Sequence, residues 1–217
     1  MKVLIIGANG QIGKNMVKMI GLSSDHEARA MVRNEKQRET MEDLGADEVV
    51  IGNLEEDFSH AFNNTDAVIF TAGSGGHTGK DKTELVDKIG AIKSIEEAEK
   101  AGVSRFIMIS TIRADKPEEG PESMKHYFEA KGAADETLQN SSLNYTILRP
   151  GSLSNDPGIG TITAKLSLDK LDAQIPREDV ANAAVNSLTI EETYHSTIEL
   201  LTGDTAIGEA LKTFKNL

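Results

Sequence analysis

The sequence predicts an α/β fold: a doubly wound, Rossmann-like parallel sheet with a small C-terminal substrate lobe. Two observations predict the sheet. Short, nearly continuous apolar runs alternate with longer segments of helical spacing, and a glycine-rich turn follows the first apolar run. Continuous apolar strands separated by helices are typical of a parallel sheet covered on both faces. Right-handed crossovers between such strands make the sheet doubly wound.

The elements of the first two thirds of the chain follow from these runs. Strands are predicted where β-branched and other apolar residues cluster, at residues 2–6, 28–32, 48–51, 67–71, 105–110 and 144–148. Helices are predicted in the longer segments between them, at residues 11–22, 35–44, 58–63, 81–101 and 123–139.

The sequence changes in character after Leu148. Residues 149–152 end a strand, and residues 155–160 are rich in turn formers. A strand at 161–166, a helix at 176–188, a strand at 197–201 and a helix from Ala206 are predicted beyond them. We expect a single domain over residues 1–217, in which residues 151–195 contribute most of the substrate lobe, because ligands bind beyond the carboxyl ends of such strands.

Composition excludes several classes of site. The 217 residues include no cysteine, which excludes disulfides, thiolate nucleophiles and cysteine-based zinc sites. The net charge of −12 argues against a nucleic-acid or membrane partner. The first apolar run is too short for a signal peptide, so we expect a cytoplasmic protein. The five histidines lack metal-ligand spacing, and no metal site is expected. Oligomeric state stays open.

A glycine motif follows the first predicted strand. Gly7, Gly10 and Gly13 form a GxxGxxG pattern at the start of the first predicted helix. Glycines allow a tight turn and close approach of the backbone to a pyrophosphate, and a helix N-terminus offers free N–H groups. We therefore expect a dinucleotide to bind here, with Asn9, Gln11 and Ile12 as neighbouring contacts. A turn that binds nothing is the alternative.

The end of the second predicted strand indicates which dinucleotide binds. An NAD site usually has an acidic residue there, to accept a hydrogen bond from the ribose 2′-hydroxyl. This strand instead ends at Val32, Arg33 and Asn34. The planar fork of an arginine suits a 2′-phosphate, so we expect NADP rather than NAD. An exposed arginine at a strand end is the alternative.

Two later strand ends support the same site. Asn53 is expected to present its amide to the adenine, with Leu54 beside it. Ala72, Gly73 and Ser74 are small enough for a ribose and diphosphate to lie against them. His77, further along this loop, is expected near a substrate pocket.

The predicted helix at 123–139 carries a lysine on its apolar face. A projection at about 100° per residue aligns six side chains in one stripe. They are Met124, Tyr127, Phe128, Lys131, Ala134 and Leu138. Lysine is unexpected in such a stripe. One alternative is a lysine whose stem lies along the apolar surface and whose ammonium pairs with Asp135.

The tyrosine and lysine also suggest proton transfer. Residues four apart on a helix lie about 5–6 Å apart at Cβ. A nearby ammonium favours phenolate, so Lys131 is expected to lower the pKa of Tyr127 and prepare it for proton exchange with a substrate oxygen. Ser110 or Thr111, at the end of the predicted strand 105–110, would hydrogen-bond the same oxygen. His126 is expected to point to solvent.

These motifs occur in a familiar order. The glycine turn, Val32-Arg33, the strand at 105–110, the Tyr127/Lys131 pair and the run at 145–151 together resemble the short-chain dehydrogenase/reductase superfamily. Within it they are similar to the atypical branch of NAD(P)-binding, epimerase-like proteins, which includes NmrA-like and biliverdin reductase B-like members. The resemblance covers essentially the whole chain.

The resemblance implies roles for further residues. Lys131 would contact the nicotinamide ribose, and Pro150, Gly151 and Ser152 would lie beside the nicotinamide ring. Asp87 stands where typical superfamily members carry an asparagine, which puts the usual proton relay in doubt. Residues 115–121 are expected to form a loop over the site, with an ordinary surface loop as the alternative.

Two functions remain open from the sequence. One is an NADP-binding oxidoreductase or epimerase-like enzyme that acts on a small carbonyl, quinone, flavin or sugar-like substrate. The other is a non-enzymatic NADP-binding redox sensor or regulator, as several atypical branches have become.

Overall fold

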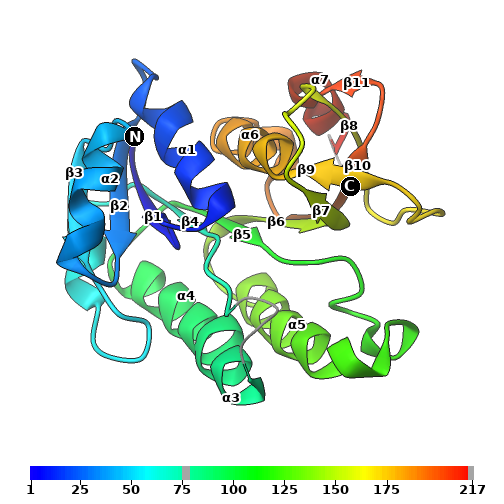
Figure 1. The fold of residues 1–217 in the computed structure, drawn as a ribbon, viewed down its shortest axis with the longest axis horizontal. Coiled ribbons are helices and arrows are strands. Elements are labelled where there is room, and N and C mark those ends of the chain that lie inside the picture. The colour runs from blue at the N-terminus through cyan, green and yellow to red at the C-terminus, as the bar shows by residue number, and fades with distance from the viewer. Residues whose placement is uncertain (75–78, 215–217) are drawn as a thin grey trace.

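The fold is organised around one large sheet, in a computed structural model that describes residues 1–74 and 79–214. Figure 1 shows the sheet edge-on between two layers of helices. Its strands, in spatial order, are β11 (Thr205–Ala206), β8 (Thr161–Lys165), β10 (Ser196–Thr202), β6 (Asn144–Pro150), β5 (Arg105–Ile109), β4 (Ala67–Phe70), β1 (Lys2–Ile6), β2 (Glu27–Val32) and β3 (Glu48–Ile51).

The strand order is that of a doubly wound sheet. From β3 to β10 all neighbouring strands are parallel, while β8 runs antiparallel to β10 and β11 antiparallel to β8. The chain proceeds from β1 outward to β3, then returns to the other side of β1 with β4. This reversal between β1 and β4 is the point where such sheets bind ligands. The Rossmann-like prediction is confirmed.

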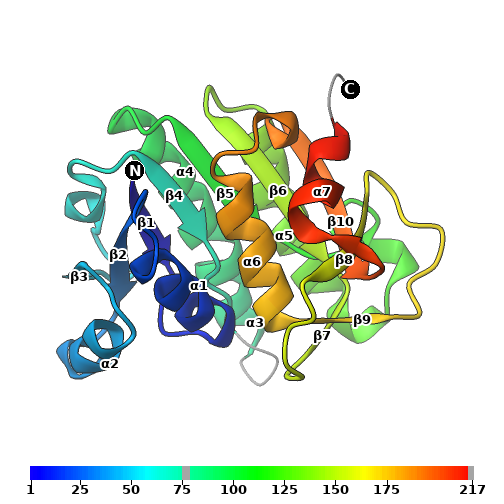
Figure 2. The same ribbon diagram turned by 90° about the horizontal axis from the view of Figure 1, so that it is seen from above.

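Helices cover both faces of the sheet. Figures 1 and 2 show α1, α6 and α7 over one face and α4 and α5 over the other. The α-helices are α1 (Gln11–Gly21), α2 (Arg38–Asp43), α3 (Lys80–Lys82), α4 (Ala91–Lys100), α5 (Lys125–Gln139), α6 (Arg177–Ser187) and α7 (Ile207–Leu211).

The sequence of β1 explains the two cores. Successive side chains of a strand point to opposite faces, so Val3 and Ile5 join the core under α1 and α6. Leu4 and Ile6 join the core under α4 and α5. All four are fully buried. A strand with both faces covered must therefore be apolar at every position, as the sequence of β1 is.

Some predicted helices have a different form in the structure. The segment predicted as one helix at 81–101 consists of α3, a π-helix at Thr83–Gly90 and α4. Residues 35–44 divide into a 3-10 turn at Glu35–Gln37, which begins with a capping box between Asn34 and Gln37, and α2. A π-helix inserts an extra residue into the helical turn, a feature frequent at functional sites.

The C-terminal third is largely part of the main sheet. β10, β8 and β11 extend the sheet, and α6 packs beside α1. A second, two-stranded sheet pairs β7 (Ser152–Ser154) with β9 (Gln174–Pro176), and neither these strands nor β11 were predicted. A substrate lobe formed mainly by residues 151–195 stays a prediction. No helix among the described residues is long and apolar enough to span a membrane.

Candidate functional site

The glycine turn between β1 and α1 is shaped by three close approaches. Gly7 has a φ of 92°, and a Cβ on it would lie 2.5 Å from the backbone nitrogen of Ala72. A Cβ on Gly13 would overlap the carbonyl oxygen of Gly7. Gly10 precedes α1 as its N-cap. The turn therefore packs tightly against the end of β4 and leaves the N-terminus of α1 at the reversal point.

A first cavity of about 370 Å³ lies beside this turn. It is lined by Ile6, Gly7, Asn9, Gly10, Met31, Val32, Arg33, Gln37, Gly52, Asn53, Leu54, Glu55, Thr71, Ala72, Gly73, Ser74, Lys82 and Val86. Gly7, Asn9 and Gly10 of the turn are thus brought together with the residues expected at the ends of β2, β3 and β4, whereas Gln11, Ile12 and Gly13 do not line this cavity. Apolar Met31 and Val86 were missed, since nothing in their local sequence marks them as wall residues rather than core.

Arg33 supplies positive charge to the first cavity. It is exposed, and its backbone N–H donates to Gln37 Oε1 at 3.1 Å. Lys82 and Glu55 also line the cavity, and their side chains neutralise each other in an ion pair at 2.5 Å. Arg33 forms no ion pair with any residue of 1–74 or 79–214. Its guanidinium is therefore available to an anion.

Asn53 lines the cavity, but its amide already has partners. Its Oδ1 accepts from the Glu55 backbone N–H at 3.2 Å, and its Nδ2 donates to Glu56 Oε1 at 3.0 Å. An amide that closes its own turn has less to offer an adenine. The adenine contact expected for Asn53 stays a prediction.

A second cavity of about 590 Å³ adjoins the first and shares Gly10, Thr71, Gly73 and Ser74 with it. Its remaining lining residues are Gln11, Ile12, Thr83, Asp87, Ser123, Met124, His126, Tyr127 and Arg177. Gln11, Ile12 and Tyr127 were expected at the site. His126 was expected to point to solvent, and this was wrong: it is half-buried in the cavity wall, because the first turn of α5 faces the cavity on more than one side.

The pKa of Tyr127 is raised in the structure, whereas the sequence predicted that it would be lowered. Burial raises the pKa of Tyr127 above its ordinary value, and the carboxylates of Asp87 and Asp135 raise it further. The sequence predicted a lowered pKa from Lys131 alone, without the burial or the two carboxylates. At neutral pH the side chain is therefore a phenol, which can donate a proton.

Lys131 lies behind the cavity wall. Its side chain is only 2% exposed, and Nζ donates to the carbonyl oxygen of Ile109 at 2.8 Å. Burial lowers the pKa of Lys131, whereas Asp87 and Asp135 oppose that change. Lys131 lines neither cavity, and one N–H of its ammonium is used by the Ile109 carbonyl. The direct ribose contact stays a prediction.

Ser110 belongs to a buried polar network rather than to the cavity wall. Its hydroxyl donates to Asp135 Oδ2 at 2.9 Å, and Arg149 Nε donates to the same oxygen at 2.9 Å. The partner of Asp135 is therefore Arg149, not Lys131 as the sequence allowed. Neither Ser110 nor Thr111 lines either cavity, so their contact with a substrate oxygen stays a prediction.

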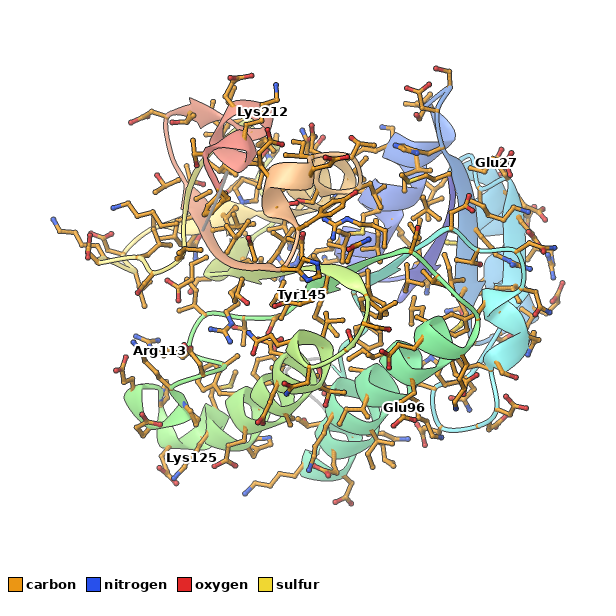
Figure 3. The ribbon with its side chains drawn as sticks, turned by 180° about the vertical axis from the view of Figure 1, so that it is seen from behind. Glu27, Glu96, Arg113, Lys125, Tyr145 and Lys212 are labelled. Atoms are coloured by element: carbon orange, nitrogen blue, oxygen red, sulfur yellow. The ribbon has the colours of Figure 1, made fainter. Side chains whose placement is uncertain are left out.

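Arg149 also reaches the loop that precedes α5. Its Nη1 lies 2.9 Å from Asp115 Oδ1. Figure 3 shows Arg113 of this loop and Lys125 at the start of α5 on the same side of the molecule. The loop at 115–121 is thus held beside the beginning of α5.

Asp87 is the buried carboxylate of the second cavity. It is 1% exposed, and its Oδ2 accepts from the backbone N–H of Ser74 at 3.0 Å. The π-helix turns Asp87 toward the end of β4, where a Cβ on Gly73 would lie 3.3 Å from Asp87 Oδ1. The sequence marked Asp87 only as a departure from a family pattern.

Three expected nicotinamide neighbours lie elsewhere. Pro150, Gly151 and Ser152 line neither cavity. The Gly151 N–H donates to the Leu200 carbonyl at 3.0 Å, and the Pro150 carbonyl accepts from the Ile112 N–H at 3.2 Å. Their role beside the ring stays a prediction. His77 lies outside the described residues. Across residues 1–74 and 79–214, no cluster of His, Asp and Glu could hold a metal.

The chain is similar to several known proteins. A family model described as NAD(P)H-binding matches residues 7–191. An uncharacterized sugar epimerase of Bacillus subtilis (strain 168), YhfK, is 49% identical over 98% of this chain and 99% of its own. A solved structure described as a NAD-dependent epimerase/dehydratase from Bacillus halodurans superposes with a TM-score of 0.96 at 46% identity, over 98% and 99% of the two chains. The oxidoreductase YlbE of Lactococcus lactis superposes with a TM-score of 0.85 at 30% identity, over 98% and 96%.

Proposed function

Because this chain belongs to the NAD(P)H-binding family, among its oxidoreductase-like and epimerase-like members, we propose that it is an NADPH-dependent reductase. Its substrate would be a small carbonyl, quinone, flavin or sugar-like compound. Tyr127 would supply the proton that accompanies the hydride.

One observation carries the proposal: two cavities meet at the carboxyl edge of the sheet. They share Gly10, Thr71, Gly73 and Ser74 as lining residues. The first extends from the glycine turn to Arg33, and the second contains Tyr127. The residues of the first cavity would hold a dinucleotide, and the second cavity would admit the substrate that its nicotinamide reduces. Tyr127 would face that substrate, because it lines the second cavity.

The residues of the first cavity fit such a cofactor. The glycine turn leaves no room for a Cβ on Gly7, so the backbone can approach a pyrophosphate closely. The N-terminal turn of α1 carries no acidic residue to repel the phosphates. Arg33, at the end of β2, would hold a 2′-phosphate through its planar fork. This favours NADP over NAD.

The side chains of the second cavity support reduction. The bound nicotinamide would supply a hydride to the substrate. A phenol with a raised pKa keeps its proton at neutral pH, so Tyr127 can donate it to the oxygen or nitrogen that becomes electron-rich. The buried cation of Lys131, one helical turn away, would stabilise the phenolate that remains.

The experiment is an NADPH-oxidation assay against aldehydes, ketones, quinones and flavins, with wild type and Tyr127→Phe. Loss of general-acid catalysis should lower kcat by about 10²–10⁴-fold, with the Kd for NADPH unchanged. Tyr194→Phe is the matched control, since Tyr194 packs against Arg105 and lines neither cavity. A Tyr127→Phe enzyme with undiminished kcat would refute the assigned role.

A specific observation also favours a second candidate, a non-enzymatic NADP-binding sensor. Of the side chains expected to act with Tyr127, Lys131 and Ser110 both point into the protein interior. Tight NADPH binding without turnover of any substrate in the assay would support the sensor instead.

A further inference from the structure

The second cavity contains one arginine whose role the proposed reductase leaves unassigned. Arg177 is half-buried at the start of α6, and its side chain lines the cavity across from the α5 residues His126 and Tyr127. Figure 1 shows that α6 and α5 cover opposite faces of the sheet, so the cavity lies between the two helical layers. Among the described lining residues, Arg177 is the one lysine or arginine.

The charge of Arg177 is not neutralised by its neighbours. Its Nη1 donates to the neutral Asn155 Oδ1 at 2.8 Å, which leaves most of the five N–H donors of a guanidinium for another partner. No carboxylate within residues 1–74 and 79–214 forms an ion pair with it.

The acidic residues next to Arg177 are occupied elsewhere. Glu178 Oε2 accepts from the Gly158 N–H at 2.9 Å. Asp179 accepts from the backbone N–H groups of Ile159 and Gly160 at 3.0 and 2.9 Å. These bonds fix the loop at 158–160 to the start of α6, and neither carboxylate forms an ion pair with the guanidinium. The cation therefore faces the cavity although the protein carries a net charge of −12.

The second cavity also contains a negative charge, the carboxylate of Asp87. Together with Arg177 it would determine the orientation of a bound molecule. This carboxylate lies on the π-helix near Tyr127, whose pKa it helps to raise. A negative group of the substrate would be repelled at the Asp87 end and attracted at the Arg177 end. The reducible group would then face Tyr127, where the proton is available.

We infer that the second cavity takes an acidic substrate, a reducible compound whose carboxylate or phosphate group is held by Arg177. This inference rests on the proposed reductase function and specifies its substrate class. Arg177 determines specificity through charge-assisted hydrogen bonds from its planar guanidinium, and His126 adds a hydrogen-bonding ring to the lining of the same cavity. The volume of about 590 Å³ is in the usual range for small-molecule sites.

The test uses pairs of compounds that share a reducible group and differ in charge. The pairs are 4-formylbenzoate with 4-formylbenzamide, anthraquinone-2-carboxylate with its carboxamide, and flavin mononucleotide with riboflavin. KM and kcat are measured with NADPH for wild type, Arg177→Gln and Arg177→Lys. Lys18→Gln is the matched control, because this exposed lysine of α1 lines neither cavity. Calorimetry of the same compounds with the NADP⁺-loaded protein gives a readout that needs no turnover.

We expect wild type to prefer the anionic member of at least one pair. Arg177→Gln should raise the KM for that member about 10- to 100-fold, the effect of losing a charge-assisted contact. The neutral member and the Kd for NADPH should change little, and Arg177→Lys should keep part of the preference. The pair that responds distinguishes a carboxylate from a phosphate. A merely structural role would affect both members equally.

Other results separate this inference from the proposed function. Turnover of both members at equal efficiency, or a preference that survives Arg177→Gln, would overturn the role of Arg177 as the binding group for an anion. The proposed reductase function would be unaffected by either result. If no compound is turned over but an anionic compound binds in an Arg177-dependent manner, anion binding by Arg177 is supported and the proposed reductase function is contradicted. If no pair shows Arg177-dependent turnover or binding, the proposed binding of an anion by Arg177 is overturned.

Discussion

Individual residues at the site owe their properties to their surroundings more than to their type. Tyr127 and Lys131 have the spacing of an acid/base pair, yet burial raises the pKa of the tyrosine and lowers that of the lysine. The carboxylates of Asp87 and Asp135 act against both deprotonations. The pair is therefore suited to donating a proton rather than to abstracting one.

This charge state predicts the pH dependence of reduction. Only the protonated Tyr127 can donate, and a raised pKa extends the range in which it is protonated. If proton donation by Tyr127 limits kcat, then kcat should not decrease up to about pH 10, the ordinary pKa of a phenol. It should decrease only above that pH. Stopped-flow measurement of NADPH oxidation from pH 6 to 11 checks this. A descending limb centred near pH 8 that Tyr127→Phe abolishes would contradict it.

Arg33 provides a second prediction at this scale. Arg33→Ala removes the guanidinium and with it one charge-assisted contact to the 2′-phosphate. The binding free energy of NADPH should weaken by about 1.5–3 kcal/mol, which raises its Kd about 10- to 100-fold. The Kd for NADH should change much less, because NADH lacks that phosphate. Calorimetric titration of Arg33→Ala with both cofactors tests this. Lys36→Ala is the control, since Lys36 is exposed nearby but lines neither cavity. Equal weakening of both cofactors would sink the assignment.

At the scale of elements, two helices carry the site and each departs from a regular surface helix. The π-helix at Thr83–Gly90 turns Asp87 into the second cavity. α5 approaches the segment after β5 so closely that a Cβ on Gly132 would overlap the carbonyl oxygen of Ala114. This approach brings Lys131 within reach of the Ile109 carbonyl. The position of α5 thus depends on a residue without a side chain.

The same substitution should have opposite effects in two helices. Gly132→Ala must push α5 away from Ala114 and should lower the free energy of unfolding by about 1–3 kcal/mol, the usual effect of overpacking. Gly208→Ala in α7 has room, with its nearest contact at 3.6 Å, and should be neutral or stabilise by up to about 1 kcal/mol. Urea unfolding of both variants provides the comparison. A Gly132→Ala protein as stable as wild type would contradict the packing argument.

At the scale of the whole molecule, the sheet unites the two halves of the site. The glycine turn and the ends of β2, β3 and β4 supply most of the first cavity, while α5 and α6 approach the second from opposite faces. The net charge of −12 acts against any anionic ligand at long range. Local groups such as Arg33 and Arg177 must therefore supply the attraction.

Cofactor binding should stabilise the entire fold, since the site is formed only in the folded chain. A free ligand at 100 times its Kd adds about 2.7 kcal/mol to the free energy of unfolding. For a domain of this size, that corresponds to a rise in Tm of about 5–10 °C. Calorimetric scans with NADPH should show the rise, and Arg33→Ala at the same NADPH concentration should show a smaller one. An unchanged Tm at saturating NADPH would contradict a folded-state cofactor site.

The sequence by itself determined the fold class, most strands and the glycine turn, because these depend on local periodicity and on backbone freedom at particular residues. It also placed Arg33 correctly, directly after β2, because the apolar run that forms this strand ends at Val32. Predicted helices at 35–44 and 81–101 were less accurate, because the first begins as a 3-10 turn and the second contains a π-helix.

Only the tertiary structure decided which polar side chains face the cavities. Lys131 and Ser110 point into the interior, while Asp87, His126 and Arg177 line the second cavity. The direction of Asp87 depends on the extra residue per turn of the π-helix, which a helical projection does not contain. Arg177 meets Tyr127 across a cavity only because the sheet brings α6 and α5 together from opposite faces, a relation that local sequence cannot encode.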